Sequence, residues 1–569
     1  MSEADTRYDF IVVGSGPAGC ATANGLSRSP KKPSVLLIEA GDDHTQAHLR
    51  VDGQRWTTFT QPSMNTGYKT APQPNCNNRV IAYDRGRGLG GSSTINFGVW
   101  TTGPRDDFDE WAKLVDDPVF AWDSMQNRFK TLETFYYDVP TGTDPSSVSS
   151  RTNDHGSAGP LHVGYASEWE KDIQPLLHTF QNIGYPVNPD HNSGNPLGMS
   201  VLINSAHSGL RSVAADLLQP KPDNLTIVTG SAVQRVILDG KKAVGVESNG
   251  KQYFATHEVI LCAGALDSPK ILLHSGIGPA DQLSRYHIPV MHDVPAVGQG
   301  LRDHAFLSLV VRRNESDNDR RSFYGSQEAM DAAQEQWNRD RTGPWSIYGC
   351  ENLIGFFKSD SVSSSMEFQN LPPSQKEFLL RETVPHYELM THFPIHYFIP
   401  GFAPENLNYD TLSIFLLNEQ SRGEVTLQSA DPNVPLKFDP NFLSHPFDQR
   451  VCIEALRAGM AVIRHPLFAK DSEADIIVPK VATSDHDLLE FWRENMTSSW
   501  HMVGTAKMGR LGDGDAVVDA NFKVLGISSL RVADNSVLPI LPNAHTQSSA
   551  YVTGMTCAEK LIAEYQLDQ

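Results

Sequence analysis

Apolar runs separated by glycine-rich turns mark the start of the chain. Residues 10–13 and 34–39 show the continuous hydrophobic pattern that is typical of buried parallel strands. Between them, a stretch rich in alanine and other small residues, 17–28, favours a helix. This order predicts a strand–helix–strand unit at the beginning of the fold.

Three later runs, 224–228, 232–238 and 259–261, have the same character and are predicted to be strands of the same domain. Residues 412–427 differ, because apolar and polar positions alternate there on either side of Gly423. Alternation around a glycine predicts an antiparallel hairpin, which would belong to a second sheet.

Two polar stretches, at 141–160 and 312–321, interrupt this pattern and indicate surface loops or crossings between domains. We therefore predict an α/β fold, in which a split Rossmann-like domain contains an inserted α+β domain built on an antiparallel sheet covered by helices. The predicted segments are 1–158, 205–306 and 486–569 for the first domain, and 159–204 and 307–485 for the second.

Composition and charge limit the number of domains, the classes of binding partner and the location that we expect for this protein. A chain of 569 residues exceeds what one hydrophobic core usually holds, so at least two domains are expected. The formal net charge of −20 disfavours nucleic acid and anionic membrane surfaces as partners. No apolar run approaches the ~18 residues of a membrane span, and no secretory signal precedes the first strand, so we expect an intracellular, cytoplasmic protein. The six cysteines are scattered without metal-ligand spacing, and no metal site is predicted.

A G-x-G-x-x-G motif joins the first strand to the first helix. Gly14, Gly16 and Gly19 form it together with Ser15, so that backbone N–H groups and the helix dipole can face a pyrophosphate. Glu39 ends the second strand, where a carboxylate binds the ribose hydroxyls of a dinucleotide. The motif alone does not separate FAD from NAD, and a simple tight turn is the alternative interpretation.

A second glycine cluster follows at residues 85–96, RGRGLGGSSTIN. Small residues over this length let the backbone lie against a large flat cofactor or its phosphates, although a surface loop would also tolerate them. This cluster favours FAD over NAD.

Together these segments resemble the glucose–methanol–choline (GMC) oxidoreductase family. The resemblance extends from residue 8 to about residue 565 in consistent order and spacing. Besides the first fingerprint, it is carried by GLGGSSTINFGVW (88–100), GALDSPKILLHSGIG (264–278), VGQGLRDH (297–304), the segment from His501 to Asp534, and PNAHTQ (542–547).

This resemblance implies FAD as cofactor, His501 in the catalytic role and His545 as its partner on the reacting face of the flavin. Some relatives attach FAD covalently through a histidine at the position of Ile95, so dissociable, non-covalent FAD is expected here. The implied cofactor contacts are Gly14, Ser15, Gly16, Gly19, Glu39, Ala40, Gly91, Ser92, Asn96, Phe97, Gly98, Val99, Val233, Ala533, Asp534, Thr546 and Gln547.

Within the family, the motifs are most similar to those of aryl-alcohol oxidases. The similarity lies in residues 542–547, in Trp500 before the catalytic histidine and in the aromatic Phe97. Phe97 and Trp500 are therefore predicted to shape the substrate pocket, although Trp500 would also fit a core position.

Alcohol oxidation removes a hydroxyl proton and a hydride from one carbon–oxygen unit, and the flavin accepts only the hydride readily. A neutral imidazole, with a reference pKa of about 6.5, suits the proton. His501 is the predicted general base, and His545 is expected to bind the substrate oxygen or to assist proton removal.

For other candidate residues, a structural interpretation stands beside the functional one. His304 is interpreted as structural, and Cys262 as a small buried residue without a paired base. An aromatic set in the inserted domain either lines the pocket or forms core, and its members are Trp345, Phe393, His396, Tyr397, Phe398 and Phe402.

The leading hypothesis is FAD-dependent oxidation of a primary, aromatic or otherwise apolar, alcohol to its aldehyde. The acceptor that reoxidises the flavin is either oxygen or another molecule, and the oligomeric state is open. A hydroxynitrile-lyase-type flavoprotein is the alternative from another class, and an FAD-bound scaffold without catalysis is a third hypothesis.

Overall fold

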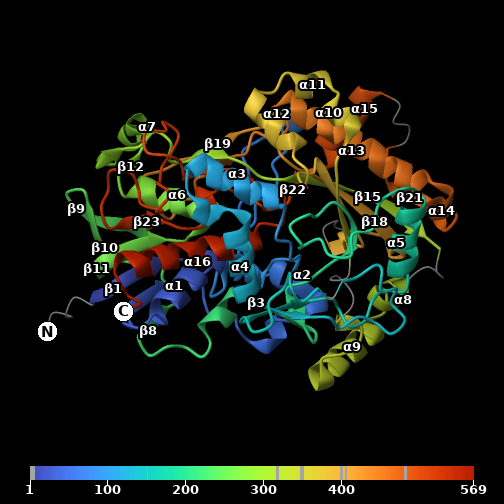
Figure 1. Ribbon diagram of the computed structural model, residues 1–569, viewed down its shortest axis with the longest axis horizontal. Helices are drawn as coiled ribbons and strands as arrows, with labels where there is room; N and C mark the ends of the chain where they lie inside the picture. Colours follow the sequence, from blue (N-terminus) through green and yellow to red (C-terminus); the bar gives the residue numbers. More distant parts are fainter. Residues whose placement is uncertain are drawn as a thin grey trace.

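Two large β-sheets form the framework of the protein (Figure 1). The structure is a computed structural model, and it describes residues 7–149, 151–314, 320–346, 352–397, 402–403, 406–479 and 484–569. Within these residues each of the two sheets has seven strands. No helix in the described part of the chain is both long and apolar enough to cross a bilayer.

The first sheet has the strand order β8-β2-β1-β11-β10-β9, and β23 pairs with β11. The pairs β1–β2, β2–β8, β1–β11 and β11–β23 are parallel, whereas β9, β10 and β11 are antiparallel. The strands are β1 Arg7–Val13, β2 Val35–Ile38, β8 Leu225–Val228, β9 Val233–Asp239, β10 Lys242–Ser248, β11 Lys251–Leu261 and β23 Leu530–Val532. The predicted strand–helix–strand unit is thereby confirmed.

The two ends of the chain meet on this sheet. Helix α1 (Pro17–Ser27) lies directly against α16 (Gln547–Glu564), as Figure 1 shows. The contact is close because small residues form it: a Cβ added at Gly554 would lie 2.1 Å from the carbonyl oxygen of Ala18. The phosphate-binding turn and the C-terminal segment are thus held side by side.

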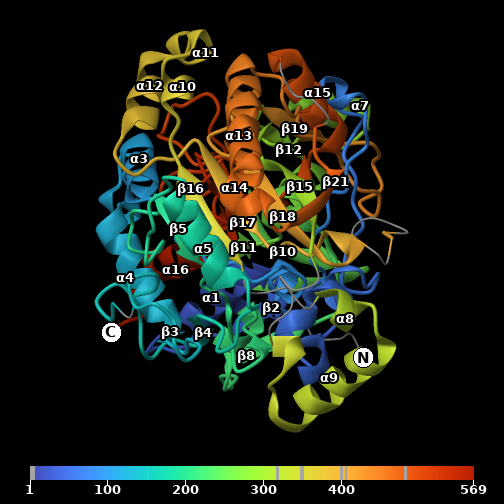
Figure 2. The same cartoon turned by 90° about the vertical axis from the view of Figure 1, so that its right-hand side faces the viewer.

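The second sheet is antiparallel throughout, with the order β21-β15-β18-β17-β16-β5 and β22 beside β15. The strands are β5 Gly198–Val201, β15 Ala305–Arg313, β16 Leu353–Phe357, β17 Tyr387–Thr391, β18 Tyr409–Leu416, β21 Ser472–Ile477 and β22 Thr497–Ser498. Helix α13 (Pro446–Arg464) covers this sheet over β17 and β18 (Figure 2). The sheet type predicted for the inserted domain is confirmed.

Shorter elements surround the two sheets. The remaining strands are β3 Glu133–Tyr136, β4 Leu161–Gly164, β6 Ala206–His207, β7 Leu210–Arg211, β12 Ile277–Gly278, β13 His292–Asp293, β14 Gln299–Leu301, β19 Gly423–Thr426 and β20 Lys437–Asp439. The remaining helices are α2 Arg55–Phe59, α3 Arg105–Val115, α4 Trp122–Leu132, α5 Ile173–Asn182, α6 Gly264–His274, α7 Ala280–Arg285, α8 Arg320–Tyr324, α9 Gln327–Asp340, α10 Asp360–Ser363, α11 Met366–Gln369, α12 Pro373–Leu380, α14 Pro466–Ala469 and α15 Asp485–Asn495.

The predicted hairpin around Gly423 is wrong. Strand β18 pairs with β15 and β17, whereas β19 pairs with β14 and β20 in a separate sheet. Between them, the buried Asp448 accepts the backbone N–H groups of Gln420 and Ser421 and redirects the chain. Alternation identifies the two faces of a strand but does not identify its neighbour.

The strands of the first sheet all come from the three segments predicted for the first domain. The second sheet, however, includes β22 from the C-terminal segment and the first two residues of β15, Ala305 and Phe306, from the middle segment, so it is not confined to the segments predicted for the second domain. The exact domain boundaries stay a prediction.

Candidate active site

One elongated cavity of about 560 Å³ reaches from the G-x-G-x-x-G turn to the two predicted site histidines. Its volume falls in the range of about 300–1,000 Å³ that is usual for cofactor and ligand pockets. Among the described residues, the predicted site residues that line it are Gly14, Ser15, Gly16, Glu39, Ala40, Gly91, Ser92, Asn96, Phe97, Gly98, Val99, Val233, Trp500, His501, Asp534, His545, Thr546 and Gln547. The predicted contacts Gly19 and Ala533 are not part of this lining.

The G-x-G-x-x-G turn that lines the cavity requires its glycines for different reasons. Gly14 has a φ of +94°, and a Cβ at Gly19 would lie 1.9 Å from the Gly14 carbonyl oxygen. Gly19 therefore lets the helix approach the strand rather than contacting a ligand. A Cβ at Gly16 would meet no protein atom within 4 Å, because this residue faces the open cavity.

Glu39 holds the two glycine clusters together. Its carboxylate accepts the backbone N–H and hydroxyl of Ser15, at 2.9 and 2.7 Å, and the backbone N–H groups of Gly41 and Gly88, at 2.9 and 3.1 Å. A Cβ at Gly91 would lie 2.6 Å from the Cα of Gly16. The second cluster thus closes the cavity and is not a surface loop.

The C-terminal helix closes the same cavity from another side. Gln547, the first residue of α16, donates to the carbonyl oxygen of Val99 at 2.7 Å and accepts from the side chain of Asn96 at 2.9 Å. Asp534 accepts the backbone N–H of Gly264 at 2.8 Å and the hydroxyl of Ser268. Segments more than 250 residues apart therefore form one wall.

The two predicted site histidines both line the cavity. The rings of His501 and His545 are 4.7 Å apart and inclined by 74°. His501 follows β22, and its backbone N–H donates to Asp303 Oδ1 at 2.7 Å. Burial, with His545, His304 and Arg85 nearby, holds the pKa of His501 well below its usual value, so its ring is neutral at physiological pH.

Different groups support the two rings. His501 Nδ1 lies 3.0 Å from His304 Nδ1, which leaves Nε2 of His501 as the nitrogen for the cavity. His545 Nε2 lies 3.0 Å from the carboxylate of Glu388, a residue of β17 with 1% exposure. The structural interpretation of His304 did not include this contact with His501. Glu388 lies in no recognised motif, and only the fold brings it close to His545.

Aromatic side chains line the cavity around the histidines. Trp500 contacts Phe59 edge-to-face at 5.0 Å, and Phe306 stacks on Phe415 at 4.6 Å. Phe97 stacks on Trp56, outside the lining, at 4.4 Å. Trp500 has a φ of +60°, which is unfavourable for a bulky residue and occurs mainly where surrounding structure enforces it. Both Phe97 and Trp500 line the cavity, and their contact with a substrate stays a prediction.

The aromatic set of the inserted domain separates into two groups. Phe393 lines the cavity and contacts Phe97 edge-to-face at 5.8 Å. In contrast, His396 bonds the hydroxyl of Tyr409 at 2.6 Å, Phe402 packs on Tyr409, and Trp345 packs in a small cluster near α8 and α9. The described atoms of these three are not part of the cavity lining. The side chain of Tyr397 and all of Phe398 lie outside the described residues.

Among the lining residues that were not predicted as site residues are three cations, Arg85, Arg87 and Lys270. Arg85 begins the second glycine cluster, and burial lowers its pKa while Asp303 opposes this change. Lys270 lies in α6 and lines the same cavity. These cations are available to an anionic ligand. Cys262 also lines the cavity, and burial raises the pKa of its thiol well above the usual value, as expected for an inert residue.

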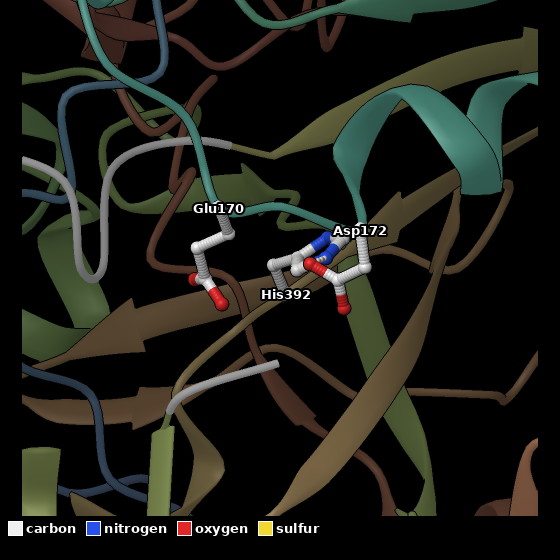
Figure 3. A group of neighbouring side chains, drawn as sticks. All are labelled: Glu170, Asp172 and His392. Atoms are coloured by element: carbon white, nitrogen blue, oxygen red, sulfur yellow. Dashed lines mark ion pairs between the residues drawn. The ribbon is translucent and has the colours of Figure 1, made fainter. Parts of the chain in front are cut away.

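A separate group of potential metal ligands lies in the inserted domain (Figure 3). Glu170, Asp172 and His392 are buried, and their ligand atoms lie within 4.8 Å of one another. His392 Nδ1 bonds the hydroxyl of Thr391, which turns its Nε2 toward Asp172 Oδ1 at 3.3 Å. None of the three lines the cavity. Their contacts account for an ion pair and assign no metal.

Comparisons with known proteins agree with this geometry. The GMC oxidoreductase family model matches residues 8–306 with its N-terminal part and 419–554 with its C-terminal part. An alcohol dehydrogenase [acceptor] of Pseudomonas putida is 30% identical and covers 98% of this chain and 96% of its own. A formate oxidase variant of Aspergillus oryzae has a TM-score of 0.90 at 27% identity, with 99% of each chain covered. A fungal aryl-alcohol oxidase shares the fold, with a TM-score of 0.84 at 23% identity and coverage of 99% and 100%.

The fold and the cavity define a flavin-dependent oxidoreductase. The chain belongs to the GMC oxidoreductase family, whose members use FAD. The cavity fits this cofactor, because Gly16 and Gly264 present Cα atoms to open space that a side chain would fill, and because Arg85 and Lys270 supply positive charge. When bound, FAD supplies the acceptor for a hydride.

Proposed function

We propose that this enzyme oxidises a primary, aromatic or otherwise apolar, alcohol to the aldehyde, with His501 as general base. The observation that carries the proposal is the pair of imidazoles, 4.7 Å apart, which line the same cavity as the G-x-G-x-x-G turn. A cavity that continues from the cofactor-binding turn to a neutral histidine has the parts that alcohol oxidation needs.

In this proposal the two histidines divide the work on the substrate hydroxyl. His501 takes the hydroxyl proton at Nε2, since its Nδ1 is engaged with His304. His545 lies beside the same hydroxyl and keeps it close to the base. Its ring is held in place because Nε2 bonds Glu388 and the backbone N–H bonds Thr101.

The walls near the histidines support an apolar substrate. Five of the side chains there are aromatic and a sixth is a methionine: Phe59, Phe97, Phe306, Phe393, Phe415 and Met390. A flat ring gains contact with such walls, and edge-to-face or stacked aromatic pairs contribute about 0.5–1.5 kcal/mol beyond area burial. A sugar, with many hydroxyls, would leave polar groups unpaired there.

Non-covalent attachment is part of the proposal. Ile95 lines the cavity at the position where some relatives carry the linking histidine, and a hydrocarbon side chain forms no bond to a flavin. Acid precipitation of the holoenzyme should release all of the yellow cofactor into the supernatant. Cofactor that stays with the precipitate would disprove this part.

Anaerobic mixing of the holoenzyme with a series of alcohols tests the activity. Benzylic alcohols should bleach the flavin absorbance faster than aliphatic alcohols of equal size, with choline and formate as further comparisons. The aldehyde formed should equal the flavin reduced. Bleaching by formate or choline alone would reject the substrate class, and cyanide release from mandelonitrile without bleaching by any alcohol would favour a lyase.

A further inference from the structure

The space behind His501 contains a second imidazole and a carboxylate. His304 lies between β14 and β15 and is 1% exposed, and its ring stands at 86° to that of His501. On its far side, His304 Nε2 lies 3.9 Å from Oε2 of Glu419, which is 5% exposed. Neither His304 nor Glu419 belongs to the described lining of the cavity.

The contact between the two rings constrains their protons. Two Nδ1 atoms 3.0 Å apart share one hydrogen, so one nitrogen donates and the other accepts. If His501 is to act as base at Nε2, its own proton must sit on Nδ1 and be donated to His304. His304 then carries its proton on Nε2, which points at Glu419.

Glu419 is suited to receive that proton. Its Oε1 accepts the backbone N–H of Ala305 at 3.1 Å. Among the described residues, neither Glu419 Oε2 nor His304 Nε2 has a hydrogen-bond partner, although both are buried. Buried polar atoms without partners are costly, and these two face each other. A movement of about 1 Å would bring them to hydrogen-bond distance.

The electrostatics of the three groups favour proton transfer from the two rings toward the carboxylate. Burial lowers the pKa of His304 to about 3 and that of His501 well below its usual value. Burial, with Asp448 and Asp303 nearby, raises the pKa of Glu419 well above its usual value. A proton that enters this group is therefore held better by the carboxylate than by either ring.

Two half-buried arginines lie near Glu419. Arg302 and Arg422 each interact with it electrostatically, and Arg422 also donates to the carbonyl oxygen of Glu419 at 2.7 Å. These cations offset part of the repulsion from Asp448 and Asp303. Glu419 is therefore able to ionise and to take a proton back.

We infer that Glu419 is the final acceptor of the alcohol proton, which reaches it through His501 and His304. The inference rests on the proposed function. The O–H bond of the alcohol breaks as an N–H bond forms at His501 Nε2, the Nδ1 proton passes to His304 Nδ1, and the His304 Nε2 proton passes to Glu419. One proton enters the relay from the alcohol and one ends on the carboxylate, while bound FAD would accept the hydride from the alcohol carbon. Both rings are neutral before and after the transfer.

Glu419→Gln tests this relay, because glutamine keeps the shape and the acceptor for Ala305 but cannot take up a proton. Flavin reduction by alcohol should fall about 10- to 100-fold, with unchanged alcohol KM, flavin content and thermal stability. The acid limb of the pH profile should move to lower pH, since an imidazole of lowered pKa replaces a carboxyl of raised pKa as the titrating group. Glu424→Gln, on the exposed side of β19, is the matched control and should behave like the parent.

A second readout follows the proton rather than the rate. In the resting holoenzyme, infrared titration should show a carboxyl C=O band that is lost in Glu419→Gln but present in Glu424→Gln. Anaerobic alcohol addition at neutral pH should increase this band as the flavin is reduced. Reduction without the band, or an unchanged rate and acid limb in Glu419→Gln, would overturn the relay while leaving the proposed function intact. Failure of every alcohol to reduce the flavin would reject both.

Discussion

His501 and His545 line the same cavity, but their rings contact different buried groups. His501 contacts another imidazole, His304, whereas His545 contacts the carboxylate of Glu388. A neutral partner gives no help to a positive charge on His501, and its pKa is lowered. A carboxylate, in contrast, fixes which nitrogen of His545 carries a proton. In the proposed function this difference gives two chemically identical side chains separate tasks, proton removal for His501 and positioning of the substrate for His545.

Replacing His501, the histidine that contacts another imidazole, should have the largest effect on the rate of flavin reduction. His501→Ala is expected to lower flavin reduction by about 10²–10⁴-fold, the usual contribution of general-base catalysis, with FAD still bound. Stopped-flow absorbance under anaerobic conditions measures the rate. His486→Ala, which removes an exposed histidine, is the control. If His501→Ala keeps more than about a tenth of the rate, His501 is not the base.

Replacing Glu388, the carboxylate that contacts His545, should have a smaller effect on kcat. Glu388→Gln keeps a hydrogen-bonding group near His545 but removes the charge. A hydrogen bond to a charged group contributes about 1.5–3 kcal/mol, so kcat should fall about 10- to 100-fold. Steady-state kinetics with the best alcohol measures this. Glu382→Gln, at an exposed ion pair, is the matched control, and equal rates for both variants would remove Glu388 from the site.

The cofactor end of the cavity can be changed without touching either histidine. In Gly16→Val the new side chain meets no protein atom close to its Cβ and extends into the cavity. FAD affinity should therefore fall by at least about tenfold, equivalent to ~1.4 kcal/mol, while the stability of the flavin-free protein is unchanged. Flavin fluorescence titration measures the affinity. Gly514→Val, also at an unobstructed glycine, is the control; undiminished affinity in Gly16→Val would mean that the fingerprint is misplaced.

A buried histidine outside the site extends the comparison to stability. His155 lies between Glu133 and Asp190, at 2.8 and 3.3 Å, and these carboxylates raise its pKa to about 9 although burial opposes them. A raised pKa stabilises the fold fully below about pH 6.5, and the contribution is lost as the pH rises to about 9. The effect is on the order of 3 kcal/mol.

The apparent Tm of the parent should accordingly fall between pH 6.5 and 9, and His155→Gln should flatten this slope. Differential scanning fluorimetry across the pH range measures both. His486→Gln serves as the exposed control and should keep the slope of the parent. Parallel slopes for the parent and His155→Gln would contradict the ion-pair assignment.

The sequence revealed those parts of the site whose physics is local. Gly14, Gly16 and Glu39 could be identified because a strand, a turn and a helix follow one another within 30 residues, and each position has a fixed geometric task. His501 and His545 were identified only through the family resemblance, since twenty histidines share the same chemistry.

The supports behind the histidines could not be predicted. Glu388 and Glu419 come from β17 and from the segment between β18 and β19, and no spacing in the sequence places them near the base. The error at Gly423 has the same origin, because the pairing of β18 and β19 with other strands depends on distant segments. Tertiary partners of this kind follow from the whole topology rather than from a local pattern.

The pairing of β22 with β15 has a consequence for engineering substrate choice. Residues Thr497 and Ser498 are hydrogen-bonded to the antiparallel sheet only a few positions before His501. β22 pairs with Ala305 and Phe306 of β15, and the predicted inserted segment begins at residue 307, so a chimaera that exchanged 159–204 and 307–485 with those of a relative would divide β15 directly after this pairing. A graft intended to bring in a new specificity should therefore also carry Ala305, Phe306 and the segment from Thr497 to His501, so that His501 arrives in register with its new pocket.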